Sequence, residues 1–268
     1  MDFRDNDLMH FDVEGALPLP VARAEGFVDH DGARIWFSTF GEGDPVVLLH
    51  GGLGNSGNWG HQVPALVDAG HRVILIDTRG HGRSTRDERP YNYQLLASDL
   101  LAVLDHLGVE KPAFIGWSDG AVVSLVHAHH HPDRARGVFF FACNMDDSGT
   151  LPFEFTPIIE RCFGRHTKDY AELSATPQRF QEFVDAVGRM QRTEPNYSRQ
   201  ALGEIRVPVT VVLGEHDEFI KREHAEYLAA SIPGAELLIL PEVSHYAPVQ
   251  RPDIFNRAVI AVLESLPH

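Results

Sequence analysis

Ser118 is the side chain in this sequence best placed to act as a nucleophile. It stands at the centre of a Gly-x-Ser-x-Gly pentad, Gly116 to Gly120, between an apolar run and a helical apolar pattern. A strand–turn–helix of this kind puts the serine on a strained corner, and the flanking glycines let strand and helix approach closely. A helix that begins at Ser118 also points free backbone N–H groups at charge developing beside the serine oxygen. The pentad predicts a nucleophile elbow; the alternative is a helix N-cap serine in an ordinary loop.

A serine hydroxyl is a poor nucleophile at neutral pH unless a base takes its proton and an acid orients that base. His245 and Asp217 each follow a predicted strand near the end of the chain. Because the carboxyl ends of parallel strands open on one edge of a sheet, we expect both side chains to meet Ser118 there. Asp146 and Asp147, which follow an earlier strand, are the alternative acids.

The elements that must position these side chains alternate between strand and helix. A hairpin is predicted across the turn Asp31-Gly32. Strands are predicted at residues 46–49, 72–76, 112–115, 138–142, 207–213 and 236–240, and helices at residues 59–69, 93–107, 118–131, 221–231 and 254–266. This order predicts a mostly parallel sheet with helices on both faces.

Two stretches interrupt the alternation. Residues 1–24 are polar, contain Pro18 and Pro20, and follow neither a helical nor a strand period, which predicts an N-terminal arm. Residues 146–204 contain no clear strand. Amphipathic segments at residues 156–163, 168–173 and 177–190 predict that this stretch is a helical cap. The core domain would then comprise residues 25–145 and 205–268.

The composition favours one catalytic domain that acts on a small molecule. The chain has 268 residues, 43% of them hydrophobic, and a formal charge of −15, which disfavours nucleic-acid and anionic-membrane partners. Only Cys143 and Cys162 are present, so we expect packing thiols in a reducing compartment. The acidic N-terminus lacks the pattern of a signal peptide, and no apolar run approaches the roughly 18 residues of a membrane helix. We expect a cytoplasmic monomer or homodimer.

Several motifs together resemble those of the α/β-hydrolase fold superfamily. They are His50-Gly51-Gly52, Asp77-Thr78-Arg79-Gly80-His81-Gly82-Arg83-Ser84, the pentad, Gly214-Glu215-His216-Asp217, and Ser244-His245 followed by Gln250-Arg251-Pro252. The resemblance covers residues 26–266 and is to the capped members: small esterases, lactonases, cofactor-free haloperoxidases, dehalogenases and C–C bond hydrolases. It implies a mostly parallel eight-stranded sheet flanked by helices, with a small helical cap after the sixth strand.

The resemblance also implies roles for individual residues. Ser118 would be the nucleophile, His245 the general base and then acid, and Asp217 the carboxylate that orients it. A dehalogenase would need a carboxylate at position 118. Within the same family pattern, His50 would brace its loop rather than act as a second base.

The oxyanion hole implied by the resemblance uses backbone N–H groups. One belongs to Asp119, directly after the nucleophile, and the other to Gly52 or Leu53. Loss of one such donor typically costs about 10²- to 10³-fold in rate, so this loop is part of the catalytic machinery.

Substrate contacts are expected from the elbow and from the cap. The cap residues expected to form an apolar wall are Phe153, Phe155, Ile158, Ile159, Phe163 and Met190. The elbow from Trp117 to Gly120 is similar to that of valacyclovir hydrolase, which implies that Asp119 binds a substrate α-amino group. The alternative for Asp119 is a solvated or arginine-paired acid stabilised by the helix dipole.

We expect neither a metal nor an organic cofactor. The run His127, His129, His130 and His131 ends the predicted elbow helix, where imidazoles suit the dipole and solvent, and no Cys or carboxylate cluster with ligand spacing accompanies it.

The expected function is a carboxylesterase-like serine hydrolase that cleaves a small carboxylic ester or lactone through an acyl-enzyme. An amino-acid ester hydrolase, a C–C bond hydrolase and a cofactor-free perhydrolase are alternatives on the same residues. A non-catalytic, receptor-like protein that binds a ligand in the same pocket is the alternative from another class. Such a protein would react slowly with a fluorophosphonate probe.

Overall fold

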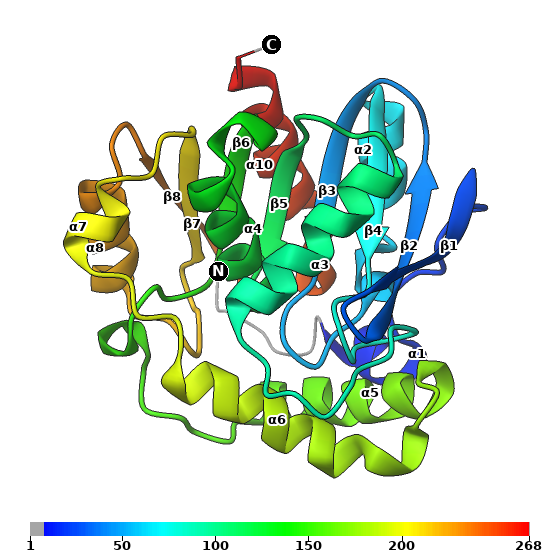
Figure 1. Ribbon diagram of the computed structural model, residues 1–268. Coiled ribbons are helices and arrows are strands. Elements are labelled where there is room, and N and C mark those ends of the chain that lie inside the picture. Colours follow the sequence, from blue (N-terminus) through cyan, green and yellow to red (C-terminus); the bar gives the residue numbers. More distant parts are fainter. Residues whose placement is uncertain (1–7, 268) are drawn as a thin grey trace.

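An eight-stranded sheet organises residues 8–267, the part of the chain that the computed structural model describes. The strand order is β1-β2-β4-β3-β5-β6-β7-β8 (Figure 1). The strands are β1 (Ala24–His30), β2 (Ala33–Phe40), β3 (Asp44–Leu49), β4 (His71–Ile76), β5 (Ala113–Trp117), β6 (Gly137–Phe141), β7 (Val209–Gly214) and β8 (Glu236–Leu240). Only β2 pairs antiparallel with its neighbours β1 and β4, and the remaining pairs are parallel. The predicted mostly parallel sheet is confirmed.

Helices cover both faces of this sheet. They are α2 (Gln62–Asp68), α3 (Tyr93–His106), α4 (Asp119–His130), α8 (Arg222–Ser231), α9 (Ala247–Gln250) and α10 (Pro252–Ser265), with short 3-10 turns η2 (Ser56–Trp59), η3 (Pro132–Arg134), η4 (Asp147–Gly149) and η5 (Pro177–Arg179). In Figure 1, α3 and α4 lie in front of the sheet, and α2 and α10 lie behind it. Every residue of β5, β6 and β7 is therefore buried, which explains their unbroken apolar sequences.

The segment between β6 and β7 is helical. It contains α5 (Pro157–Leu173), α6 (Phe180–Thr193) and α7 (Arg199–Leu202), and α5 and α6 lie across one end of the sheet (Figure 1). Two amphipathic segments predicted separately, residues 156–163 and 168–173, belong to the single helix α5 because no proline interrupts the residues between them.

The N-terminal stretch contains a helix that the sequence pattern did not predict. Helix α1 (Met9–Glu14) packs on α5, and Leu8 and Phe11 are buried in the hydrophobic core. A helix this short produces no usable periodicity and depends on tertiary contacts for its stability. Part of the predicted arm, residues 1–7, lies outside the described residues.

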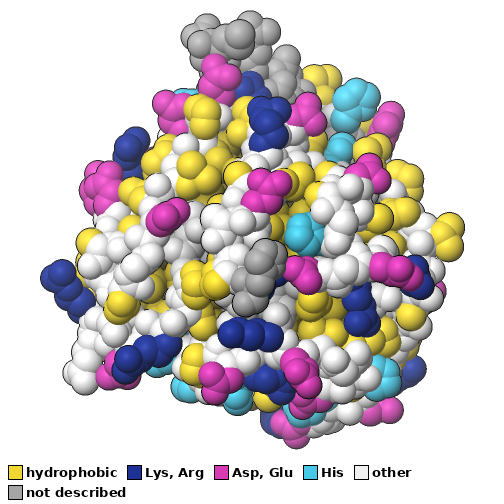
Figure 2. Space-filling model, turned by 90° about the horizontal axis from the view of Figure 1, so that it is seen from above, with side chains coloured by type: hydrophobic (Ala, Val, Ile, Leu, Met, Phe, Trp, Pro, Cys, Tyr) yellow, Lys and Arg dark blue, Asp and Glu magenta, His cyan; other side chains and the backbone are white. Residues whose placement is uncertain are grey.

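Charges of both signs are mixed on the face at the end of the sheet away from α5 and α6. Figure 2 shows Asp and Glu side chains interspersed there with Lys and Arg, and not gathered into a patch of one sign. Among residues 8–267, every helix is too short or too polar to cross a membrane.

Candidate active site

Ser118 occupies a strained corner between β5 and α4. Its backbone φ is 54° and its ψ is −123°, values that a residue with a side chain rarely adopts. The flanking glycines make this corner possible. A Cβ on Gly116 would lie 2.3 Å from the Cα of Ala121, and a Cβ on Gly120 would lie 2.1 Å from the carbonyl oxygen of Leu49. The Ser118 side chain is left partly exposed to solvent.

The structure brings His245 and Asp217 into direct contact. The Nδ1 atom of His245 lies 3.0 Å from Oδ2 of Asp217, and both side chains are buried. The other carboxylate oxygen of Asp217, Oδ1, accepts the backbone N–H groups of Phe219 at 2.9 Å and Ile220 at 2.8 Å. Burial by itself would lower the pKa of His245, but the charge and hydrogen bond of Asp217, together with the charges of Glu218 and Asp119, outweigh it, so the pKa is raised above 6.5.

The alternative acids are used elsewhere. Asp146 accepts the backbone N–H of Ser148 at 2.9 Å and so caps the turn η4, and Asp147 is exposed to solvent. Neither lines the cavity described below.

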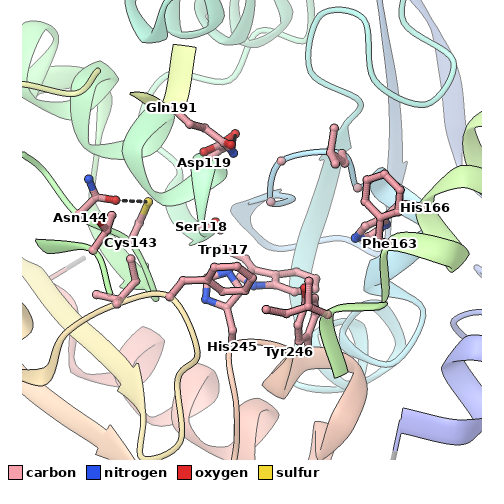
Figure 3. A pocket seen from close by; sticks show the side chains of 18 of the residues that line it. Trp117, Ser118, Asp119, Cys143, Asn144, Phe163, His166, Gln191, His245 and Tyr246 are labelled. Carbon is pink, nitrogen blue, oxygen red and sulfur yellow. Dashed lines mark hydrogen bonds between the residues drawn. The ribbon is translucent and has the colours of Figure 1, made fainter. Parts of the chain in front are cut away.

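Ser118 and His245 line one cavity of about 380 Å³ between the cap and the carboxyl ends of the strands. In Figure 3, Ser118 lies between Asp119 and His245, with Trp117 beside the histidine. The cap contributes Phe153, Phe155, Ile159 and Phe163 to the lining, as expected. Two expected wall residues, Ile158 and Met190, do not line the cavity and are buried in the hydrophobic core.

Asp119 is neither solvated nor paired with arginine, which corrects the alternative considered above. Its carboxylate is buried, and it accepts the Tyr93 hydroxyl on Oδ1 at 2.8 Å and the Gln191 amide on Oδ2 at 3.0 Å. Figure 3 shows Gln191 beside Asp119 at the cavity. Burial raises the pKa of Asp119, and the two hydrogen bonds oppose that rise. No motif marked Tyr93 or Gln191, since each meets Asp119 only through the tertiary structure.

The loop after β3 lies beside this carboxylate. A Cβ on Gly52 would lie 2.6 Å from both Oδ2 of Asp119 and Nε2 of Gln191, so a side chain at this position would displace the hydrogen-bonded pair. Leu53 follows with a positive φ of 63°, and both residues line the cavity together with Asp119. The residues expected to supply the oxyanion hole, Asp119 and either Gly52 or Leu53, therefore line the same cavity as Ser118.

His50 braces the same loop, as the family resemblance implied. The backbone N–H of Thr78 donates to Nε2 of His50 at 3.1 Å, so Nδ1 carries the proton that is donated to the Gly51 carbonyl at 2.8 Å. Burial lowers the pKa of His50, which keeps the ring neutral.

The histidine run differs from expectation at its first member. His127 is fully buried against Phe114 rather than solvated, and burial lowers its pKa to about 4. Among residues 8–267, no group of three or more His, Cys, Asp or Glu side chains could hold a metal ion. Cys143 lines the cavity, and Cys162 is buried in the core.

The sheet topology and the corner at Ser118 are those of the α/β-hydrolase fold. The model of the alpha/beta hydrolase fold family matches residues 44–172. A 2-hydroxy-6-oxononadienedioate/2-hydroxy-6-oxononatrienedioate hydrolase from Comamonas testosteroni is 25% identical over 86% of this chain and 91% of its own. The human protein named serine hydrolase BPHL is 25% identical over 85% of this chain and 82% of its own. The solved structure of Est816, described as an N-acyl homoserine lactone degrading enzyme, has a TM-score of 0.69 and 29% identity, covering 88% of this chain and 99% of that one. The family model and these relatives together support the place of this chain in the α/β-hydrolase superfamily.

Proposed function

We propose that this protein is a serine hydrolase that cleaves a small carboxylic ester or lactone through an acyl-enzyme on Ser118. The observation that carries the proposal is the buried His245–Asp217 pair, which shares one cavity with a serine on a strained corner. With its Nδ1 proton held by Asp217, the His245 ring leaves Nε2 free to accept a proton.

Each step of the reaction is assigned to a group in the cavity. His245 takes the Ser118 proton as the serine oxygen attacks the carbonyl carbon, and backbone N–H groups stabilise the oxyanion. The protonated ring then gives its proton to the departing alkoxide, and the acyl group stays on Ser118. Water attacks this acyl-enzyme with His245 again as base, which releases the acid and restores the serine. Asp217 orients the ring throughout.

The charges around the cavity favour neutral substrates over anionic ones. Among the described residues that line it, Arg and Lys are absent, whereas Asp119 and Glu194 are present. A dicarboxylate of the kind named for the Comamonas hydrolase would find no cation there to neutralise it. A neutral ester or lactone avoids this cost, and Est816 is a relative described as acting on a lactone.

An amino-acid ester is the second candidate substrate, favoured by the environment of Asp119. Its buried carboxylate faces the cavity with neutral hydrogen-bond donors and without a cation. A substrate ammonium group would stabilise the ionised form of this acid in a partly dry site.

The test is kcat/KM for p-nitrophenyl acetate, butyrate and octanoate and for an α-amino acyl ester. The wild-type protein is compared with Asp119→Asn, which keeps the backbone N–H, and with Ser118→Ala. Hydrolysis of neutral esters that Ser118→Ala abolishes supports the main proposal. A preference for the amino ester that Asp119→Asn removes supports the second candidate. Full activity of Ser118→Ala, or a wild-type protein that does not label with a fluorophosphonate probe, refutes the mechanism.

A further inference from the structure

Glu218 is a second acid in contact with His245. It follows Asp217 directly in the loop between β7 and α8, and its Oε2 accepts the backbone N–H of His245 at 3.0 Å. Its other oxygen, Oε1, is buried and has no hydrogen-bond partner among residues 8–267. The sequence motif ended at Asp217, so no pattern marked this residue.

Two consecutive acids therefore bind one histidine at two points. Asp217 binds the ring at Nδ1, and Glu218 binds the main chain. The first contact sets the rotation of the ring, and the second sets the position of the backbone that carries it. Holding both the ring and the main chain reduces the freedom of the base that takes the Ser118 proton.

The surroundings of Glu218 raise the pKa of its carboxyl into the neutral range. Burial raises the pKa of Glu218 to about 7, because the N–H and charge of His245 only partly offset the burial and the nearby Asp217 charge raises the pKa further. The other titratable groups close enough to interact are the Cys162 thiol of α5 and the Tyr246 hydroxyl. Burial raises the pKa of both, so neither supplies a charge near neutral pH.

We propose that Glu218 is a positioning residue for His245 whose carboxylate, once ionised, joins Asp217 in stabilising the imidazolium formed when Ser118 attacks. The proposal rests on the proposed function, since it requires His245 to act as the base. Glu218 does not exchange a proton with substrate. Its negative charge favours the protonated ring, and its contact with the His245 main chain keeps the ring in place.

Three variants separate the effect of the Glu218 charge from the effect of its hydrogen bond to the His245 main chain. Glu218→Gln removes the charge and keeps an oxygen that can accept the His245 N–H. Glu218→Asp keeps the charge but is one methylene too short for the same contact. Glu215→Gln is the matched control, because Glu215 lies in the same loop and its carboxylate also accepts a backbone N–H at 3.0 Å, that of Glu242, away from His245.

The readout is the pH dependence, from pH 5 to 9, of the rate of fluorophosphonate labelling and of kcat/KM for p-nitrophenyl butyrate. For Glu218→Gln we expect the acid midpoint to move lower by about 0.5 to 1 unit and the plateau rate to fall by about 3- to 10-fold. Glu218→Asp should keep a midpoint close to that of the wild-type protein with a lower plateau, and Glu215→Gln should match the wild-type protein in both. Melting temperatures identify any variant that is misfolded.

The outcomes distinguish this inference from the proposed function. A wild-type protein that does not label refutes the proposed function. A wild-type protein that labels, with a folded Glu218→Gln whose midpoint is unchanged, refutes the role of Glu218, as does a Glu218→Asp midpoint that shifts like that of Glu218→Gln. Carbon-13 NMR of the wild-type protein gives an independent check: the Glu218 carboxyl should titrate near pH 7, and a carboxyl that stays protonated through pH 9 overturns the inference.

Discussion

Replacing Asp217 with asparagine should force His245 into the wrong tautomer. In the wild-type protein, Oδ1 of Asp217 is held by the backbone N–H groups of Phe219 and Ile220. The carbonyl oxygen of an asparagine would keep these two bonds, so its NH₂ group must take the place of Oδ2, 3.0 Å from Nδ1 of His245. An amide donor there makes Nδ1 an acceptor and moves the ring proton to Nε2, the nitrogen that has to accept from Ser118.

The expected loss of kcat is therefore large, although asparagine has almost the same shape as aspartate. An aspartate-to-asparagine change that imposes the wrong tautomer lowers kcat by about 10⁴-fold, which corresponds to about 5 kcal/mol of transition-state stabilisation. The assay is kcat for p-nitrophenyl butyrate at pH 8, together with the rate of fluorophosphonate labelling. The melting temperature should stay close to that of the wild-type protein, because both backbone bonds at position 217 persist.

Asp147→Asn is the matched control, since Asp147 is the exposed member of the alternative pair of acids. We expect it to retain activity within about twofold, as for most surface substitutions. If folded Asp217→Asn kept more than about a tenth of wild-type activity, or if Asp147→Asn were inactive, the assignment of the acid and the tautomer argument would both be wrong.

Three further predictions follow from other contacts. The kcat/KM for p-nitrophenyl butyrate should fall as the pH is lowered, with a midpoint above pH 6.5. The reason is that Asp217 raises the pKa of His245 and that only the neutral ring accepts a proton. A midpoint below pH 6.5 in the pH profile contradicts this. Gly120→Ala should cost about 1–3 kcal/mol or more, because its Cβ would meet the Leu49 carbonyl at 2.1 Å, and an unchanged melting temperature would refute the clash. Tyr93→Phe should lower the free energy of unfolding by about 1–3 kcal/mol in a denaturant titration, because Oδ1 of the buried Asp119 loses its donor; an unchanged value would show that another group satisfies it.

Much of the core fold was predictable because its signals are local. An apolar run bounded by loop residues marked β8 over residues 236–240, and the structure has this strand at Glu236–Leu240. The glycines around Ser118 likewise belong to one short segment, where the need to avoid a Cβ acts on neighbouring residues. Helix α1 and the continuity of α5 were missed because short or surface helices depend on what they pack against.

Contiguous residues encode the order of strands and helices and the strained corner at the serine. They also encode the placement of a histidine and an acid directly after late strands. The partners of the buried polar side chains are different, because burial and hydrogen bonding depend on segments that are distant in the chain. Asp119 is joined to Tyr93 across 26 positions and to Gln191 across 72, and Glu218 meets His245 across 27. The pKa of each of these carboxyls is raised by burial in a low-dielectric environment, which forms only when the sheet, the loops and the cap pack together.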